Sequence, residues 1–358
     1  MITTYAPGRA ELLGNHTDYN EGLVLSLAIS YGTTISADAN DAGEINLYAR
    51  EFDRHWSGKL DNLAPQGRET WANYILGVVA QLRRRGVTVS GFDAEISSTI
   101  PIGAGLSSSA SLEIATALTV QKLFPYEMSR LDLARVGQAA EHTYAGVKCG
   151  LLDQISVALS KQNHATYIDC RAFEISHLPL GADVEFVIAH SGVKHALTAG
   201  EYNERRESCE AAARLLGVKA LRDVTASGLE AARAKLPGRV YKRAAHVVGE
   251  NERVTRARDL LANNKMKEFG ALMFESHESS IHNFENSCEE LDFLVGEARK
   301  SPACLGARLS GGGFGGATIN LVRRKDADPF CASLSAAYEQ QYGKRPLILK
   351  TEACAAAE

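Results

Sequence analysis

A run of small residues and serines lies directly before an apolar segment that reaches Phe124: Pro101-Ile-Gly-Ala-Gly-Leu-Ser-Ser-Ser-Ala-Ser111. Small residues let the backbone approach an anion, and the N–H groups at a helix start favour negative charge. The run therefore predicts a phosphate-binding loop before a buried helix, with Ser107, Ser108 or Ser109 as the N-cap. For such a loop taken alone, a plain Gly/Ser connection is the alternative.

Polar side chains gather in the first twenty residues, between glycines and ahead of a strand-like segment at 23–29: Arg9, Glu11, Asn15, His16 and Asp18. We read this stretch as a loop that a strand holds in place. Binding residues often lie on loops that a rigid scaffold positions. The stretch is therefore a candidate ligand-binding loop.

Two acids stand at the ends of predicted helical segments. Glu141 lies near the end of an amphipathic segment at 128–145, and Asp153 opens another apolar segment. Each has a structural alternative, because a solvated helix acid and an acid in a first helical turn are both common. Further along, Gly311-Gly-Gly-Phe-Gly-Gly316 holds five glycines in six residues. Such a run implies close approach of backbone to something else.

The elements that must position these residues are both helical and extended. Alternating apolar residues predict strands of one mixed sheet in the first hundred residues, and helical spacing predicts a helix at 71–82. The second half is mostly helical. The predicted strands are 23–29, 32–37, 44–49, 92–99, 165–169, 184–189, 318–322 and 346–350, and the later helices are 201–216, 246–261 and 266–277.

The length of 358 residues favours two domains, because a single hydrophobic core rarely grows that far. The segment 171–183 carries Pro179 and Gly181 and is the predicted boundary, which gives domains at 1–175 and 176–358. Lys and Arg number 39 against 43 Asp and Glu, a net charge of −4 with no long basic run. This argues against nucleic-acid and membrane-surface partners.

Seven cysteines are widely spaced and include no C-x-x-C pair, so neither a disulfide framework nor a zinc site is indicated. The N-terminus lacks a signal-peptide pattern, and no stretch approaches about 18 uninterrupted apolar residues. We expect a soluble protein of the reducing cytoplasm. The sequence leaves the oligomeric state open, with a monomer as the working expectation.

Four motifs stand in order along the chain, and together they resemble the galactokinases of the GHMP small-molecule kinase superfamily. They are Pro7-Gly-Arg9 with Gly14-Asn-His-Thr-Asp-Tyr-Asn20, the serine loop at 101–111, Cys149-Gly-Leu-Leu-Asp-Gln154, and the late glycine run. Weaker matches are Glu201-Tyr-Asn-Glu-Arg-Arg206, His246-Val-Val248 and Glu275-Ser-His277. The loop lacks the Gly-Lys-Ser/Thr end of a Walker A motif, so the order and number of motifs carry the resemblance.

The resemblance implies a two-domain α+β GHMP kinase fold with the active site at the domain junction. The N-terminal domain would be ribosomal S5 domain 2-like and the C-terminal domain ferredoxin-like. ATP phosphates would bind the loop backbone, and Mg²⁺ would bind Ser109 and Glu141, because it prefers oxygen ligands. Apart from the resemblance, Trp71 and Tyr74 lie at a predicted helix start, where an aromatic ring could face the purine, although the apolar face that includes Trp71 favours the core. The implied loop residues are Gly103, Ala104, Gly105, Leu106, Ser107, Ser108 and Ser109.

The same resemblance implies that Asp153 is the general base for the anomeric hydroxyl of a sugar and that Arg9 is the cation beside it. The implied sugar-binding residues are Asn15, His16, Asp18, Gly150, Asp153 and Tyr202, with Lys194 as a weaker candidate. Two alternatives stay open: His16 as a satisfied structural histidine, and Tyr202 as a ring that only packs. The implied reaction is ATP-dependent phosphorylation of D-galactose to α-D-galactose 1-phosphate and ADP.

One departure from the family concerns the sugar. Galactokinases usually read Arg-Val-Asn-Leu-Ile-Gly-Glu-His-Thr-Asp-Tyr, so this chain has Glu11 for the asparagine and Asn15 for the acid that faces the C6 hydroxyl. Losing that carboxylate removes a charge-assisted hydrogen bond and also the repulsion that would exclude a sugar acid. A galacturonokinase is therefore the alternative enzyme, and a non-catalytic sugar sensor is the alternative outside enzymes.

Two further departures have no interpretation in the sequence. Ile281-His-Asn-Phe284 stands where galactokinases more often have Arg-Asp-Asp-Tyr. Only eight residues precede Arg9, which is a shorter lead than is usual in the family.

Overall fold

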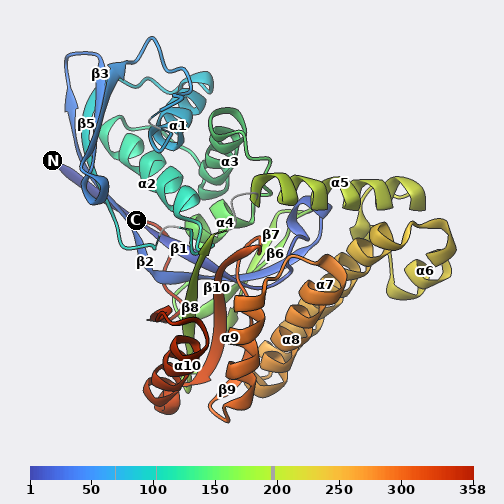
Figure 1. Ribbon diagram of the computed structural model, residues 1–358. Coiled ribbons are helices and arrows are strands. Elements are labelled where there is room, and N and C mark those ends of the chain that lie inside the picture. The colour runs from blue at the N-terminus through green and yellow to red at the C-terminus, as the bar shows by residue number, and fades with distance from the viewer. Residues whose placement is uncertain (69, 102, 195–197) are drawn as a thin grey trace.

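The protein contains two β-sheets surrounded by helices in its computed structural model, which describes residues 1–68, 70–101, 103–194 and 198–358 (Figure 1). The first sheet has the order β4-β3-β5-β2-β6-β7, with β1 paired to β2. Only the β3–β5 pair is parallel, so the predicted mixed sheet is confirmed. Its strands are β1 (Ile2–Leu13), β2 (Leu23–Asn40), β3 (Glu44–Ala49), β4 (Arg54–Lys59), β5 (Gly91–Ser98), β6 (His164–Asp169) and β7 (Glu174–Pro179).

Two expectations for this sheet were wrong. The two strands predicted at 23–29 and 32–37 form the single strand β2. The predicted loop at the start of the chain is the strand β1 up to Leu13, with an irregularity in register between Pro7 and Arg9. Its partners are distant in sequence: β2, and the last residue Glu358, whose backbone exchanges hydrogen bonds with Tyr5. Figure 1 accordingly shows the two chain termini near each other.

Four helices cover one face of this sheet and complete what we call the N-terminal lobe: α1 (Ala72–Arg84), α2 (Ser108–Leu123), α3 (Arg130–Ala140) and α4 (Leu152–Leu159). Helix α2 follows the serine loop and is buried over most of its surface, as predicted. The helix predicted at 128–145 is capped by the Ser129 hydroxyl and becomes a π-helical turn at Glu141–Ala145.

The second sheet is antiparallel, with the order β11-β8-β10-β9. Its strands are β8 (Val184–Lys194), β9 (Cys304–Leu309), β10 (Gly315–Arg323) and β11 (Leu347–Thr351), and α9 (Glu289–Lys300) and α10 (Ala327–Tyr342) pack against it. In chain order, β8, α9, β9, β10, α10 and β11 form a β-α-β-β-α-β unit, which agrees with the ferredoxin-like expectation.

A block of helices connects β8 to α9: α5 (Thr198–Leu216), α6 (Ala226–Ala231), α7 (Gly238–Ala262) and α8 (Met266–Ser279). Helix α5 is followed by Gly217 in the left-handed conformation, as its sequence predicted. Helices α7 and α8 pack with β8 and β10 against the second face of β1 and β2. The β1–β2 pair therefore lies between the two halves of the molecule.

The predicted division at residue 175 falls within β7, a strand of the first sheet. The sheets change over between Pro179 and Val184, and the C-terminal tail returns to the N-terminal lobe through Ala357 and Glu358. The division into folding units stays a prediction. Within the described residues, none of the helices combines the length and apolar character that crossing a membrane requires.

Candidate active site

The predicted base and its cation are in direct contact. Arg9 of β1 donates from Nε and Nη2 to Oδ1 of Asp153, at 2.8 and 2.7 Å. Asp153 lies in the first turn of α4, and its other oxygen accepts the Ser107 hydroxyl at 2.5 Å. A third donor of Arg9, Nη1, reaches the carbonyl of Gly105 at 2.6 Å. One guanidinium therefore links the carboxylate to the predicted phosphate loop.

The serine loop has the backbone of an anion-binding turn. Gly103, Gly105 and Ser107 alternate in the left-handed region, with φ of 72°, 69° and 55°. Between them Ala104 and Leu106 are buried and anchor the loop in the core. This alternation suits a concave run of N–H groups ahead of α2. Ser107 was one of the three serines expected to cap the helix with its hydroxyl. It stands at the N-cap position, but its hydroxyl binds Asp153 instead of the helix backbone.

The late glycine run packs against this loop. A Cβ on Gly105 would lie 2.8 Å from the carbonyl oxygen of Ser310, and one on Gly311 would lie 3.0 Å from the carbonyl oxygen of Gly105. Both glycines have positive φ. Only glycine permits this approach, so the close backbone contact expected from the sequence is confirmed.

Ser109 and Glu141 also lie together. The Glu141 carboxylate accepts hydrogen bonds from Ser109, from Gln154 Nε2 at 3.0 Å and from Cys149 Sγ at 3.4 Å. Burial, followed by the charge of Asp153, raises the pKa of Glu141 to about 7.

An alcohol and a carboxylate fit Mg²⁺, which takes oxygen ligands and usually only one or two from the protein. Among the described residues, no group of three or more His, Cys, Asp or Glu side chains is placed to hold a metal ion.

Three of the predicted sugar residues meet beside Asp153. Asp18 lies in the short 3₁₀ helix η1 (Asp18–Asn20), and a Cβ on Gly150 would come within 1.9 Å of its Oδ2. Burial, followed by the negative charge of Asp153, raises the pKa of Asp18 to about 7. Tyr202 of α5 also lies here: burial, then the charge of Asp18, raises its pKa well above the ordinary value.

His16 is fully engaged within the protein. Its Nδ1 lies 2.8 Å from the Tyr19 hydroxyl and its Nε2 lies 3.1 Å from the Gly312 carbonyl. Burial lowers its pKa to about 4, so the ring is neutral at physiological pH. The Tyr202 ring packs on it with a centroid distance of 5.0 Å. These contacts favour the structural alternative for His16.

Asn15 is likewise held by protein groups on all sides. Its Nδ2 donates to Glu11 Oε1 at 3.0 Å and to the Gly311 carbonyl at 2.8 Å, and its Oδ1 accepts from Asn286 at 2.9 Å. Glu11 in turn forms a buried ion pair of 2.9 Å with Arg308. The side chain of Asn15 is 1% exposed. Asn15 therefore holds the segment 14–20 against Gly311 and Asn286 from inside the protein.

Several residues that support the segment 14–20 carry little signal in the sequence. Glu250 of α7 accepts the backbone N–H groups of Gly14 and Asn15 at 2.7 and 2.8 Å. It lies one turn after His246, which approaches the carbonyl of Asn15 at 3.2 Å. The four-residue spacing of His246 and Glu250 is the sequence signal that could have identified them, because residues at this spacing share one face of a helix. Asn286 and Arg308 carry no comparable local signal.

The roles of the predicted site residues, Trp71 and Lys194 among them, stay predictions. Trp71 precedes α1, and its ring packs partly against the core of the N-terminal lobe. The side chain of Lys194 lies outside the described part of the structure.

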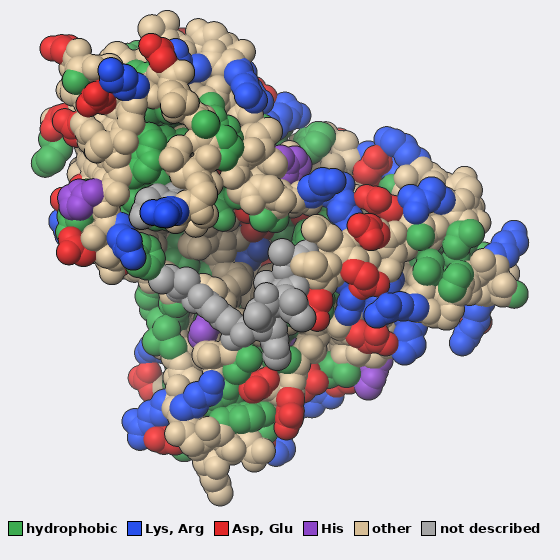
Figure 2. All heavy atoms as spheres, turned by 45° about the horizontal axis from the view of Figure 1, so that its top comes forward, with side chains coloured by type: hydrophobic (Ala, Val, Ile, Leu, Met, Phe, Trp, Pro, Cys, Tyr) green, Lys and Arg blue, Asp and Glu red, His purple; other side chains and the backbone are tan. Residues whose placement is uncertain are grey.

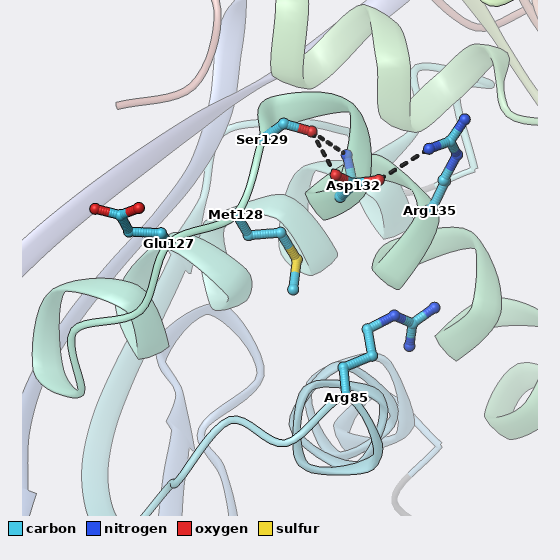
Figure 3. Close-up of a pocket in the computed structure, with 6 residues that line it drawn as sticks. All are labelled: Arg85, Glu127, Met128, Ser129, Asp132 and Arg135. Atoms are coloured by element: carbon cyan, nitrogen blue, oxygen red, sulfur yellow. Dashed lines mark hydrogen bonds and ion pairs between the residues drawn. The ribbon is translucent and has the colours of Figure 1, made fainter.

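The side chains of the site come from both halves of the molecule. Figure 2 shows the surface hollowed between the N-terminal lobe, at the top of the view, and the rest of the molecule. A separate cavity of about 710 Å³ lies between the end of α1 and the start of α3 (Figure 3). Asp132 binds both Ser129 and Arg135 there, and none of the predicted site residues lines it. That cavity is therefore separate from the site.

Three family models match the chain: "GHMP kinases N terminal domain" at residues 73–161, "Galactokinase galactose-binding signature" at 2–39 and "GHMP kinases C terminal" at 257–340. The galactokinase of Chloroflexus aggregans is 40% identical over 350 residues, which cover 96% of this chain and 90% of the relative. That of Haemophilus influenzae (strain Rd) has the same identity and coverage.

Solved structures agree with these matches. The Lactococcus lactis galactokinase complexed with galactose has a TM-score of 0.96 and 31% identity, covering 99% of this chain and 94% of that one. A Methanococcus jannaschii mevalonate kinase, at 20% identity and a TM-score of 0.73, shares the fold over 99% of this chain and 98% of its own. The chain therefore belongs to the galactokinase family of the GHMP kinases, which are enzymes that phosphorylate small molecules with ATP.

Proposed function

We propose that the protein phosphorylates the anomeric C1 hydroxyl of D-galactose with ATP, giving α-D-galactose 1-phosphate and ADP. The observation that carries this proposal is the Asp153 carboxylate, which Arg9 and Ser107 orient next to the phosphate loop. The relatives' name and the galactose complex of the Lactococcus lactis protein support galactose as the acceptor.

In this reaction Asp153 receives the proton of the C1 hydroxyl as the sugar oxygen bonds to the γ-phosphorus. The bond between that phosphorus and the bridging oxygen of ADP breaks, and ADP leaves. Arg9 stabilises the negative charge that builds in the transition state, and the loop backbone holds the phosphates. Positioning contributes much of the rate in phosphoryl transfer, so the fixed orientation of Asp153 is part of its role.

Ser109 and Glu141 are the proposed ligands of Mg²⁺. When bound, the cation neutralises charge on the phosphate oxygens of ATP. Asp18, Tyr202 and the backbone at Gly150 are the proposed sugar contacts, because Asp18 packs against Gly150 and the charge of Asp153 acts on both Asp18 and Tyr202. We further propose that the enzyme acts in the cytoplasm, where ATP is available, and that it acts as a monomer.

A substrate panel tests this function. Purified protein with MgATP is assayed for ADP release with galactose, galacturonate, N-acetylgalactosamine and L-arabinose. We expect galactose to give the highest kcat/KM, with the product identified by NMR as the α-1-phosphate. Activity with galacturonate alone would overturn the choice of sugar. Binding of both sugar and ATP without turnover would instead indicate a sensor.

A further inference from the structure

Two buried carboxyl groups behind the phosphate loop share one amide. Gln154 Nε2 donates to Glu113 Oε2 at 2.9 Å and to Glu141 Oε2 at 3.0 Å. Gln154 and Glu113 are 0% exposed, and Glu141 is 7% exposed. A side chain with no exposed surface cannot touch a ligand, so any role of Glu113 and Gln154 in the reaction is indirect, and Glu141 is the more exposed group that Gln154 binds.

Three helices converge on this group. Ser109 and Glu113 are four residues apart in α2, so they lie on one face of the helix, with Glu113 one turn deeper. In α3, a Cβ on Gly137 would lie 3.0 Å from Glu113 Oε2 and 3.1 Å from Gln154 Cγ. The glycine therefore leaves the room that the carboxyl and the amide occupy. Gln154 comes from α4, directly after Asp153.

The amide restrains the carboxylate that would face the cation. A carboxyl group rotates readily about its terminal bond, and ligands of a cation are usually oriented by further hydrogen bonds behind them. Of the three groups that bind Glu141, Ser109 would itself turn toward the cation and the Cys149 thiol is a weak donor at 3.4 Å. Gln154 is the strongest fixed restraint.

We propose that Gln154 is a positioning residue that aligns the Glu141 carboxylate for the cation accompanying ATP, and that Glu113 holds the Gln154 amide in this orientation. The inference rests on the proposed function, since it takes Glu141 as a cation ligand. Removing the amide leaves Glu141 free to rotate and Glu113 without its partner. Metal affinity then falls, while sugar binding beside Asp18 is unaffected.

Calorimetry of ATP binding to the full chain, with and without Mg²⁺, tests the proposal. The measured quantity is the gain in ATP affinity that Mg²⁺ provides. In Gln154→Ala, Gln154→Glu and Glu113→Ala we expect this gain to fall about 10- to 100-fold, the usual cost of losing an orienting partner. Glu113→Gln keeps an oxygen that accepts from Gln154, so it should stay within about threefold of the parent.

Gln81→Ala is the matched control. Gln81 is also buried in the N-terminal lobe, and its amide donates to the Thr143 hydroxyl at 3.2 Å, in the same turn as Glu141 but not to its carboxylate. We expect it to leave the Mg²⁺ gain unchanged. The proposal would be overturned if folded Gln154→Glu kept the parent's gain in ATP affinity from Mg²⁺. It would also be overturned if Gln81→Ala lost as much of that gain as the Gln154 variants.

If Gln154→Ala does not fold, the contrast between Glu113→Ala and Glu113→Gln decides. Equal Mg²⁺ gains in these two variants would contradict the role of Glu113. Since calorimetry needs no turnover, the result does not depend on which sugar is phosphorylated. A missing galactose activity would thus count against the proposed function alone.

Discussion

Arg9 and Asp153 are 144 positions apart in the sequence, yet two guanidinium nitrogens of Arg9 converge on one carboxylate oxygen. This leaves the second oxygen of Asp153 to Ser107. The Arg9 side chain is 6% exposed and that of Asp153 is 26% exposed. The guanidinium is thus part of the interior, while the Asp153 carboxylate keeps some exposed surface.

Replacing Asp153 should remove catalysis without unfolding the protein. We expect Asp153→Asn to lower kcat by about 10²- to 10⁴-fold, the range of general-base contributions, because its amide oxygen can still accept from Arg9. Asp153→Ala should lose as much activity and also some stability, since it leaves the buried guanidinium unpaired. The checks are kcat from ADP release and thermal unfolding by circular dichroism. Parent-like turnover in either variant would show that another group takes the proton.

Gly150→Ala should damage the sugar site through Asp18. The added methyl group would lie 1.9 Å from Asp18 Oδ2, so the carboxyl or the backbone must move. A displacement of about 1 Å in a positioned group can cost about 10² in kcat/KM, and we expect a loss of that order for the sugar. The matched control is Gly296→Ala in α9, where a Cβ has open space. Equal sugar kinetics in the two variants would mean that Asp18 does not contact the sugar.

Glu11 and Asn15 should behave as a coupled pair. Glu11→Asn leaves Arg308, whose side chain is 0% exposed, without its carboxylate, at a cost of about 3–5 kcal/mol. Asn15→Glu places a second carboxylate beside Glu11. The double exchange keeps one charge and one amide, so we expect it to be more stable than the sum of the single changes by more than about 1 kcal/mol.

Urea denaturation of the four proteins of this cycle measures the coupling. If the changes in the free energy of unfolding of the two single variants sum to that of the double variant, Glu11 and Asn15 are not coupled. The kcat/KM ratio of galactose to galacturonate in the same proteins tests whether position 15 also sets C6 preference. Because Asn15 is 1% exposed and bound by Glu11, Gly311 and Asn286, we expect Asn15→Glu to leave that ratio unchanged; a raised ratio would show that position 15 faces the sugar.

Asp18 should make stability depend on pH. Its pKa is about 7 in the folded protein against an ordinary 3.8, so folding favours the protonated form. A raised acid pKa contributes stability that is full below the unfolded pKa and is lost as pH rises through the folded one. Asp18→Asn removes this dependence.

Relative to the parent, the free energy of unfolding of Asp18→Asn should therefore rise by about 2 kcal/mol between about pH 5 and pH 8. This figure is smaller than the full pKa shift would give, because Asp18 is partly exposed and solvent screens its charge. Denaturant titrations across that range measure the difference. A difference that stays constant with pH would show that Asp18 is ionised in the folded protein throughout.

Much of the candidate site could be predicted because the residues that define it lie in short, continuous sequence motifs. The glycines and serines at 103–109 dictate a left-handed alternation and a helix start within a few residues. Gly217 marked the end of α5, and apolar periodicity marked α1, α2 and α8. Strand β1 was missed because Pro7 and Gly8 weaken a strand locally. Its extended form depends on pairing with β2 and with Glu358.

The sequence by itself determined the family, and it singled out the serine loop and the acids Glu141 and Asp153 as candidates, since each lies in a recognisable motif. Only the tertiary structure decided which polar side chains form their hydrogen bonds within the protein. Asn15 and His16 bind carbonyls 296 positions away, and Ser107 gives its hydroxyl to Asp153 rather than to its own helix. The physical reason is that a polar side chain binds whichever partner the fold brings within about 3 Å, and those partners are not its sequence neighbours.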